Sequence, residues 1–224
     1  YEESTFQVGS YRIPKIILPK RPGPPINLLE SRQSQLIRGH GISDQELHEH
    51  FNGVPNKEII QYLFNGECDD EMINKYSLLK EEYYRQYCQE DVESFHLVEG
   101  VEQYFNELIK RNIPFTIASA SIKENIDFFV ESFHLDNWIN PKNIVYDDGT
   151  YKNKIAMFEK ASEILNIELK ECLIFEDSIS GIKNAYRAGC PHIIVIDSAN
   201  KKEEYQDLPG VIKVIDNFVG LESL

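Results

Sequence analysis

The stretch ECLIFEDSISGIKNAYRAGCPHIIVI, residues 171–196, contains the pattern that decides the fold. A short apolar run at 171–175 predicts a buried strand, and a second run at 192–196 predicts another. Between them, residues 182–188 have helical spacing and stop at Gly189, a residue type that suits the position after a helix. Strand, helix and strand in this order are typical of a parallel sheet covered by helices, so an α/β fold is expected.

The same alternation extends from this stretch toward the N-terminus. Helical spacing at 100–111 leads into a short β-rich run at 114–118, and a helix is expected over 124–133. A strand at 143–146 and a helix at 156–165 complete the series. This βαβαβ series predicts a doubly wound parallel sheet.

Residues from about 30 to 90 follow a different pattern, because three helical segments succeed one another with no β-rich run between them. Ser43 and Glu46 have the spacing of a capping box, in which each side chain bonds a free backbone N–H of the other residue. Asp69 or Asp70 is placed to cap the long helix that runs toward Gln89. This part of the chain is therefore expected to be all helical.

The helical segment interrupts the α/β pattern, so two domains are expected. An α/β core domain would comprise residues 15–29 and 92–224, and a helical cap domain would comprise residues 30–91. Since the insertion falls between the first and second strands of the sheet, we expect it to form a lid.

The composition excludes some classes of partner. The 224 residues have a formal net charge of −14, which disfavours attraction to nucleic acid or to an anionic membrane surface. Apolar runs such as 193–196 are far too short to span a bilayer, and the charged N-terminus lacks a secretory signal pattern. The four cysteines are widely spaced and indicate reduced, mostly buried thiols. A cytoplasmic location and a monomer are expected.

Candidate ligand residues follow two of the predicted strands, because ligands of open α/β sheets bind beyond the carboxyl ends of the strands. After the first of them come Ser119, Ala120 and Ser121, where a hydroxyl and backbone N–H groups before a helix suit a phosphate oxygen. A simple serine N-cap is the alternative. After the second come Glu176 and Asp177, whose carboxylates suit Mg2+. Helix capping by an acidic pair is the alternative there.

Lys154 lies between these two places in the sequence. An ammonium group there would neutralise a phosphoryl group, although a lone loop lysine is usually only a solvated charge. The order and spacing of all these residues give the stronger signal.

In order and spacing these residues resemble the second, third and fourth motifs of the haloacid dehalogenase-like hydrolase superfamily, in its β-phosphoglucomutase-like branch with a helical cap. IASAS at 117–121 is similar to the second motif, and FEDSISGIKNAYRAG at 175–189 is similar to the fourth. The resemblance covers roughly residues 15–220. It implies a Mg2+-dependent phosphatase or phosphomutase acting on a small phosphorylated metabolite, with a sugar phosphate as the expected class.

The resemblance also implies a role for each matching residue. Ser119 and Lys154 match the residues that hold the transferring phosphate, with Ala120 beside Ser119. Glu176 and Asp177 match the carboxylates that hold Mg2+. After Lys154 the chain departs from the family pattern, because the usual Lys-Pro-x-Pro-Asp run is replaced by KIAM.

The cap contains a similar match. HFNGVPNKE at 50–58 resembles the substrate-specificity loop of the family, at the start of a cap helix. Gly53 allows the backbone beside Val54 to approach a ligand, and Asn56 or Lys57 would read its distal group. An interhelical turn is the alternative. In β-phosphoglucomutase itself a cationic side chain of this loop holds a second phosphate, whereas Asn56 stands at that position here.

The first motif of the family, a strand followed by Asp-x-Asp-Gly-Thr, is missing from its expected place. Counting back from the cap puts the strand at 15–18 and the motif on PKRPGPP at 19–25. Lys20 then replaces the nucleophilic aspartate and Pro22 replaces the acid/base aspartate, and proline has no proton to exchange. The run DDGT at 147–150 lies between the second and fourth motifs, and we expect it to be a surface turn.

Two explanations remain open for this difference. Either the chain is a non-catalytic member that retains phosphate-binding groups, or residues 19–25 do not represent the strand and loop of the native enzyme. The first hypothesis for function is thus a phosphatase or phosphomutase that works through an aspartyl-phosphate, and the second is a pseudoenzyme that binds a phosphorylated ligand. A nucleotide-binding or redox protein would need a glycine-rich first turn, which the sequence lacks.

Overall fold

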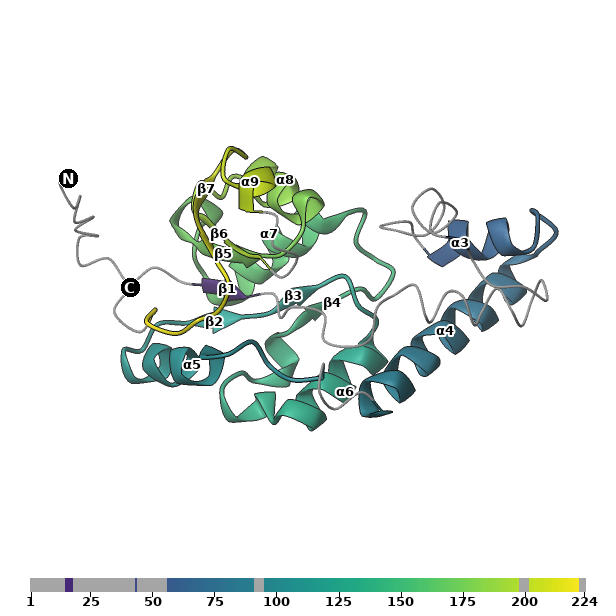
Figure 1. Cartoon of the computed structure of the whole chain (residues 1–224), viewed down its shortest axis with the longest axis horizontal. Helices are drawn as coiled ribbons and strands as arrows, with labels where there is room; N and C mark the ends of the chain where they lie inside the picture. The colour runs from purple at the N-terminus through teal and green to yellow at the C-terminus, as the bar shows by residue number, and fades with distance from the viewer. Residues whose placement is uncertain (1–14, 18–42, 44–55, 91–94, 198–201, 222–224) are drawn as a thin grey trace. The chain divides into compact units, whose positions relative to one another are not determined.

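The computed structural model describes residues 15–17, 43, 56–90, 95–197 and 202–221 (Figure 1). The chain divides into two compact units, one of residues 1–20 and 97–224 and one of residues 21–96. Each unit is described by itself. The finer domain boundaries expected from the sequence, 30–91 for the cap, fall partly outside the described residues and stay a prediction.

The larger unit is built on a parallel five-stranded sheet with the order β2-β1-β5-β6-β7 (Figure 1). A second parallel pair joins β3 to β4. The bounds of the strands are β1 Lys15–Ile17, β2 Phe115–Thr116, β3 Ala118–Ser119, β4 Val145–Tyr146, β5 Leu173–Glu176, β6 Ile193–Ile196 and β7 Val211–Ile215. The expected doubly wound α/β fold is confirmed.

Helices connect these strands, as the alternating pattern predicts. Their bounds are α5 Val101–Lys110, α6 Lys123–Phe133, α7 Lys154–Leu165, α8 Ile179–Arg187 and α9 Lys202–Tyr205. Short 3-10 turns lie at η1 Leu135–Asn137, η2 Pro141–Asn143 and η3 Leu169–Glu171. The largest difference from the predicted bounds concerns α8, which begins three residues before the expected Ile182.

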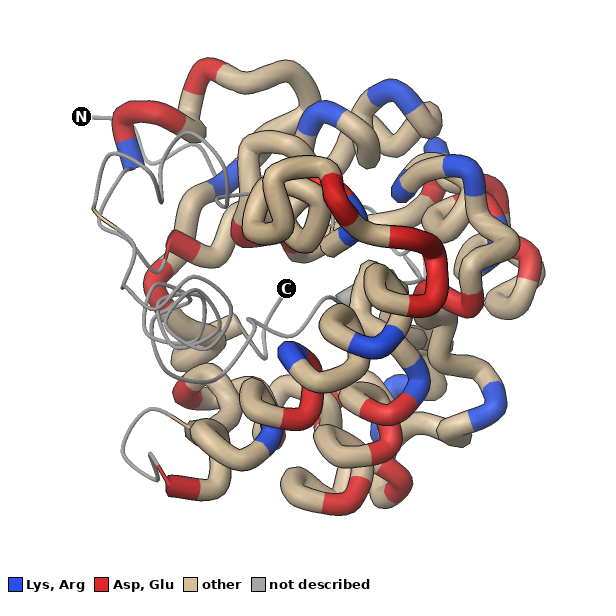
Figure 2. The backbone as a smooth tube through the Cα atoms, turned by 90° about the vertical axis from the view of Figure 1, so that its right-hand side faces the viewer, with Lys and Arg blue, Asp and Glu red and all other residues tan. Residues whose placement is uncertain are grey.

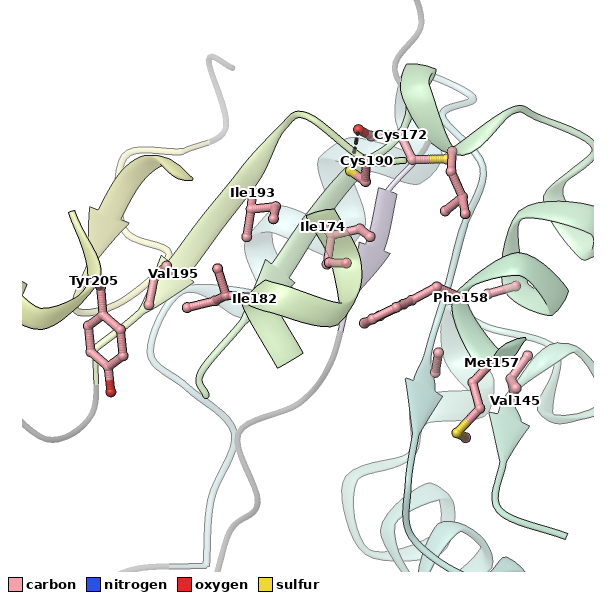
Figure 3. Close-up of a cluster of buried hydrophobic side chains, with 14 residues drawn as sticks. Val145, Met157, Phe158, Cys172, Ile174, Ile182, Cys190, Ile193, Val195 and Tyr205 are labelled. Atoms are coloured by element: carbon pink, nitrogen blue, oxygen red, sulfur yellow. Dashed lines mark hydrogen bonds between the residues drawn. The ribbon is translucent and has the colours of Figure 1, made fainter. Parts of the chain in front are cut away.

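The two faces of the sheet bury alternate residues of the same strand. On β5, Ile174 joins a core cluster with Ile182 of α8 and Phe158 of α7 (Figure 3). Its neighbours Leu173 and Phe175 join a second cluster, which includes α5. Because a strand covered on both faces needs apolar residues at every position, its sequence is a continuous apolar run. This burial on both faces explains why LIFE and IIVI were readable as strands.

Between residues 56 and 90 the smaller unit consists of two helices joined by a turn at residues 64–69. Its helices are α3 Asn56–Leu63 and α4 Asp70–Glu90, which bury Ile59, Ile60, Leu63 and Ile73 together. Asp69 caps α4, since its Oδ1 accepts a hydrogen bond of 2.8 Å from the backbone N–H of Met72. Glu46, the second half of the predicted capping box, lies outside the described residues.

The distribution of charged residues and the state of the cysteines agree with what the composition predicts. Lys and Arg positions are scattered among the more numerous Asp and Glu positions along the described backbone (Figure 2). All four cysteines lie in the described part of the chain and none forms a disulfide there; Cys88, Cys172 and Cys190 are buried. None of the helices that the structure describes combines the length and apolar character needed to cross a membrane.

Candidate functional site

Glu176 is the last residue of β5, and its side chain is completely buried. Its Oε2 atom accepts hydrogen bonds from the backbone N–H of Asp177 at 3.1 Å, from that of Ser178 at 3.4 Å and from the Ser178 hydroxyl at 3.2 Å. Its Oε1 atom forms an ion pair with Nζ of Lys154. Both oxygens of this buried carboxylate are therefore engaged.

Burial raises the pKa of Glu176, because removal from water penalises the charged form. The neighbouring Asp177 carboxylate raises this pKa further, whereas the Lys154 ammonium and the hydrogen bonds act in the opposite direction. Burial is the largest of these effects. Burial of the Glu176 carboxylate costs free energy, which the Lys154 ammonium and the hydrogen bonds from Asp177 and Ser178 offset.

Lys154 is the first residue of α7, and its position depends on the start of that helix. Asn153 caps α7, because its side chain accepts a hydrogen bond of 3.1 Å from the backbone N–H of Ala156. The Lys154 side chain is 22% exposed, and its Nζ lies 5.8 Å from the centroid of the Phe158 ring. Lys152, in contrast, is exposed. The structure thus brings Lys154 together with Glu176, 22 positions later in the sequence (176 − 154).

Ser119 is the last residue of β3, whereas the sequence pattern placed it just after the strand. Its hydroxyl accepts a hydrogen bond of 3.2 Å from the backbone N–H of Ser121, and Ala120 between them is exposed. The Ser121 carbonyl accepts a hydrogen bond of 2.9 Å from the N–H of Asp147, which follows β4. The two loops after β3 and β4 are therefore linked. The Ser119 hydroxyl hydrogen stays available as a donor to a ligand.

The run at 147–150 is an exposed turn, as expected. Asp147 accepts a hydrogen bond from the N–H of Gly149 at 3.0 Å. Asp148 accepts from the N–H and the hydroxyl of Thr150, at 2.9 and 2.6 Å, and these bonds lower the pKa of Asp148. Their carboxylates are used within the turn.

The smaller unit contains a polar cluster at the position of the predicted specificity loop. Asn56 begins α3; its amide donates to Glu81 at 3.1 Å and its carbonyl oxygen accepts from Lys80 at 2.8 Å. Lys80 and Glu81 also form an ion pair and are each only 5% exposed. The sequence pattern did not predict this pair, whose signal is two charged residues on the buried face of α4. Gly53 and Val54 lie outside the described residues.

Glu176 and Asp177 fit a Mg2+ ion in their donor chemistry. Mg2+ takes oxygen ligands and is often held by one or two carboxylates together with water and phosphate oxygens. Two carboxylates beside one ammonium leave a net negative charge at the end of β5, which favours a cation. Within the described residues, no group of three or more His, Cys, Asp or Glu side chains is placed to hold a metal. Lys20 and Pro22 lie outside the described residues, after β1, whose Ile17 pairs with Phe175.

Comparison with known proteins agrees with this architecture. The chain is 31% identical to a HAD hydrolase, family IA, variant 3, from Entamoeba histolytica, with a TM-score of 0.83 over 92% of this chain and 93% of that one. It is 17% identical to CbbY from Rhodobacter sphaeroides, solved in complex with phosphate, with a TM-score of 0.69 over 93% and 96%. It is 18% identical to β-phosphoglucomutase from Clostridium difficile, with a TM-score of 0.65 over 92% and 91%.

The last two similarities concern the fold alone, since both identities are low. The match that decides the family covers most of the sequence, because the family model for haloacid dehalogenase-like hydrolases matches residues 29–195. With the 31% identical Entamoeba protein, this match makes the chain a member of the haloacid dehalogenase-like hydrolase family.

Proposed function

We propose that the chain binds the phosphoryl group of a small phosphorylated metabolite, with a sugar phosphate as the expected class, in a Mg2+-assisted site of the phosphatase or phosphomutase type. The observation that carries the proposal is the ion pair between Lys154 and the buried Glu176, with Asp177 beside it at the end of β5. A parallel sheet presents this end to its ligands. The phosphate complex of the similar CbbY supports the same ligand chemistry.

In this proposal each side chain has a separate task. Lys154 donates to a phosphoryl oxygen, while Ser119 supplies a hydroxyl donor and Ala120 a backbone N–H. Glu176 and Asp177 hold Mg2+, which when bound supplies neutralisation of the phosphoryl charge. In the smaller unit, the predicted specificity residues Gly53, Val54 and Asn56 would contact the distal part of the ligand, which for Asn56 requires exchange of its hydrogen bonds to Lys80 and Glu81.

Turnover is a separate question, because Lys20 and Pro22 stand where the family has its nucleophile and its acid/base. Without a carboxylate to attack phosphorus, the covalent route of the family is lost. The residues of the first motif therefore favour a second candidate, a phosphate-binding pseudoenzyme of the same family. The two candidates share one binding site and differ in catalysis. A cytoplasmic monomer remains the proposed state.

Calorimetric titration of the full chain with inorganic phosphate, with and without Mg2+, tests the binding proposal. We expect Mg2+ to strengthen phosphate binding. Lys154→Met should weaken binding by at least about tenfold, because a hydrogen bond to a charged group contributes about 1.5–3 kcal/mol. Lys152→Met is the matched control, since it removes an equal charge two positions away and should leave binding unchanged. Equal losses in the two variants, or no binding by the unmodified chain, would rule the proposal out.

A further inference from the structure

The hydroxyl of Ser178 connects the buried carboxylate to the start of α8. It donates a hydrogen bond of 3.2 Å to Oε2 of Glu176 and accepts one of 3.0 Å from the backbone N–H of Gly181. The helix start fixes the hydroxyl, and the hydroxyl fixes one oxygen of the carboxylate. Glu176 is therefore oriented by a residue outside its own strand.

Gly181 supplies the space that this arrangement needs. A Cβ atom on residue 181 would lie 2.1 Å from Cδ, Oε1 and Oε2 of Glu176. Real Cβ atoms do not approach other heavy atoms so closely, so any side chain here would displace the carboxylate. Glycine within a helix normally weakens it relative to alanine. Its presence in the first turn of α8 is explained by the approach of Glu176.

Ordinary helix capping explains only part of these contacts. An N-cap serine needs to accept from an N–H of the first turn, as Ser178 does from Gly181. Capping does not require the hydroxyl to donate to a buried carboxylate, nor does it require glycine at position 181. Both features act on the same group, Glu176.

We propose that Ser178 and Gly181 are positioning residues that hold the Glu176 carboxylate in the orientation required by the phosphoryl and metal site. This inference rests on the proposed function. Ser178 acts by donating to Oε2, and Gly181 acts by leaving room for both oxygens. Partners of this kind behind a metal ligand typically change metal affinity about 10- to 100-fold when removed.

The test separates capping from positioning by the choice of substitution at residue 178. Glycine is nearly as good an N-cap as serine but has no hydroxyl, so Ser178→Gly removes the donor with little effect on the helix. Ser178→Thr keeps both the donor and the cap. Ser180→Ala is the control on the same turn, since Ser180 is exposed and its hydroxyl accepts a long hydrogen bond of 3.5 Å from the Asn184 amide.

Mn2+ is the probe, and its affinity is measured by electron paramagnetic resonance on the full chain and on its Lys20→Asp, Pro22→Asp form. We expect Ser178→Gly and Gly181→Ala to weaken Mn2+ binding about tenfold or more, while Ser178→Thr and Ser180→Ala retain the parent affinity. Without metal, the 13C signal of the Glu176 carboxyl carbon should move in Ser178→Gly and stay in Ser180→Ala.

The outcomes distinguish this inference from the proposed function. If both parent forms bind Mn2+ and Ser178→Gly binds it equally well, with an unmoved carboxyl signal, the positioning role is overturned and the proposed function stands. If neither parent form binds Mn2+, the metal part of the proposed function fails and the positioning role fails with it. Ser178→Gly keeps the test decisive even if Gly181→Ala does not fold.

Discussion

At the scale of single residues, the Lys154–Glu176 ion pair dominates the energetics of the candidate site. Glu176 is completely buried, and Lys154 is mostly buried. Taking a carboxylate out of water is costly unless a partner cation and hydrogen bonds compensate. The net contribution of the intact pair to the free energy of unfolding is therefore small. Removing one partner is costly, because the other charge would stay buried without compensation.

Removal of the cation should be strongly destabilising. We expect Lys154→Met to lower the free energy of unfolding at neutral pH by about 3 kcal/mol, because breaking a buried pair leaves an uncompensated charge. Replacing both partners, as Lys154→Met with Glu176→Gln, should recover part of this loss. Urea unfolding of the parent, the two single variants and the double variant measures the coupling. Additive effects in this cycle would show that the two groups do not interact.

The loss in Lys154→Met should also depend on pH. Burial raises the pKa of Glu176 above its ordinary value of 4.5, and loss of the nearby ammonium raises it further. With a raised pKa the folded state binds the proton more tightly than the unfolded state, so stability falls as pH rises through the folded-state pKa. We expect the stability difference between parent and Lys154→Met to be smallest near pH 5 and to grow toward pH 8. A difference independent of pH would contradict this cause.

At the scale of elements, the central strands hold the site in place through burial on both faces. Phe175, next to Glu176, is fully buried against the rings of Tyr104 and Phe218, with centroids at 5.6 and 5.0 Å. Both rings come from outside the sheet, Tyr104 from α5. The packing of Phe175 on this face thus fixes the end of β5 from which Glu176 extends.

Truncation of this ring should cost about 3–5 kcal/mol in the free energy of unfolding, as is usual when a buried phenylalanine becomes alanine. Thermal and urea unfolding of Phe175→Ala measure this loss. Ile212→Ala on the edge strand β7 is the control, since Ile212 is 56% exposed and its loss should change stability by no more than about 0.5 kcal/mol. Similar losses at the two positions would mean that the packing around Phe175 is not the source.

The sequence predicts the central elements better than their ends. The runs at β5 and β6 were readable because both faces are buried, whereas β7, with Ile212 and Lys213 exposed, was missed. The predicted strand 114–118 is divided at Ile117, because β2 pairs with β1 and β3 pairs with β4. Such a change of partner is a tertiary effect that local periodicity does not encode.

At the scale of the whole molecule, we expect catalysis to depend on residues 19–25, the segment where the sequence departs from the first motif of the family. The sequence predicted the α/β class, and the family resemblance implied one phosphate and metal site for Lys154, Glu176 and Asp177; the structure pairs Lys154 with Glu176. The sequence did not predict Ser178 and Gly181 as supports of Glu176, since their role depends on distances between side chains. Lys20 and Pro22, which stand at the predicted first-motif positions, are the residues on which we expect turnover to depend.

Hydrolysis of p-nitrophenyl phosphate with Mg2+ should be near background for the unmodified chain. A Lys20→Asp, Pro22→Asp variant should gain activity, since an acid/base group alone typically contributes about 10²–10⁴-fold. The control is the same variant with Asp177→Asn. Metal-dependent turnover of the unmodified chain at rates typical of enzymes, abolished by Asp177→Asn, would show that the first motif has been placed wrongly.

The buried thiols of Cys172, the residue before β5, and of Cys190 allow local opening around β5 to be measured chemically. Burial raises the pKa of Cys172 to about 12 and that of Cys190 to about 11, so almost no thiolate is present at neutral pH in the folded state. The Cys190 thiol also donates a hydrogen bond of 3.3 Å to the backbone carbonyl of Cys172. An alkylating reagent should therefore modify these two sulfurs only when β5 separates from its surroundings. The rate of their alkylation then reports how often the strand that carries Glu176 is exposed, in the absence of any substrate.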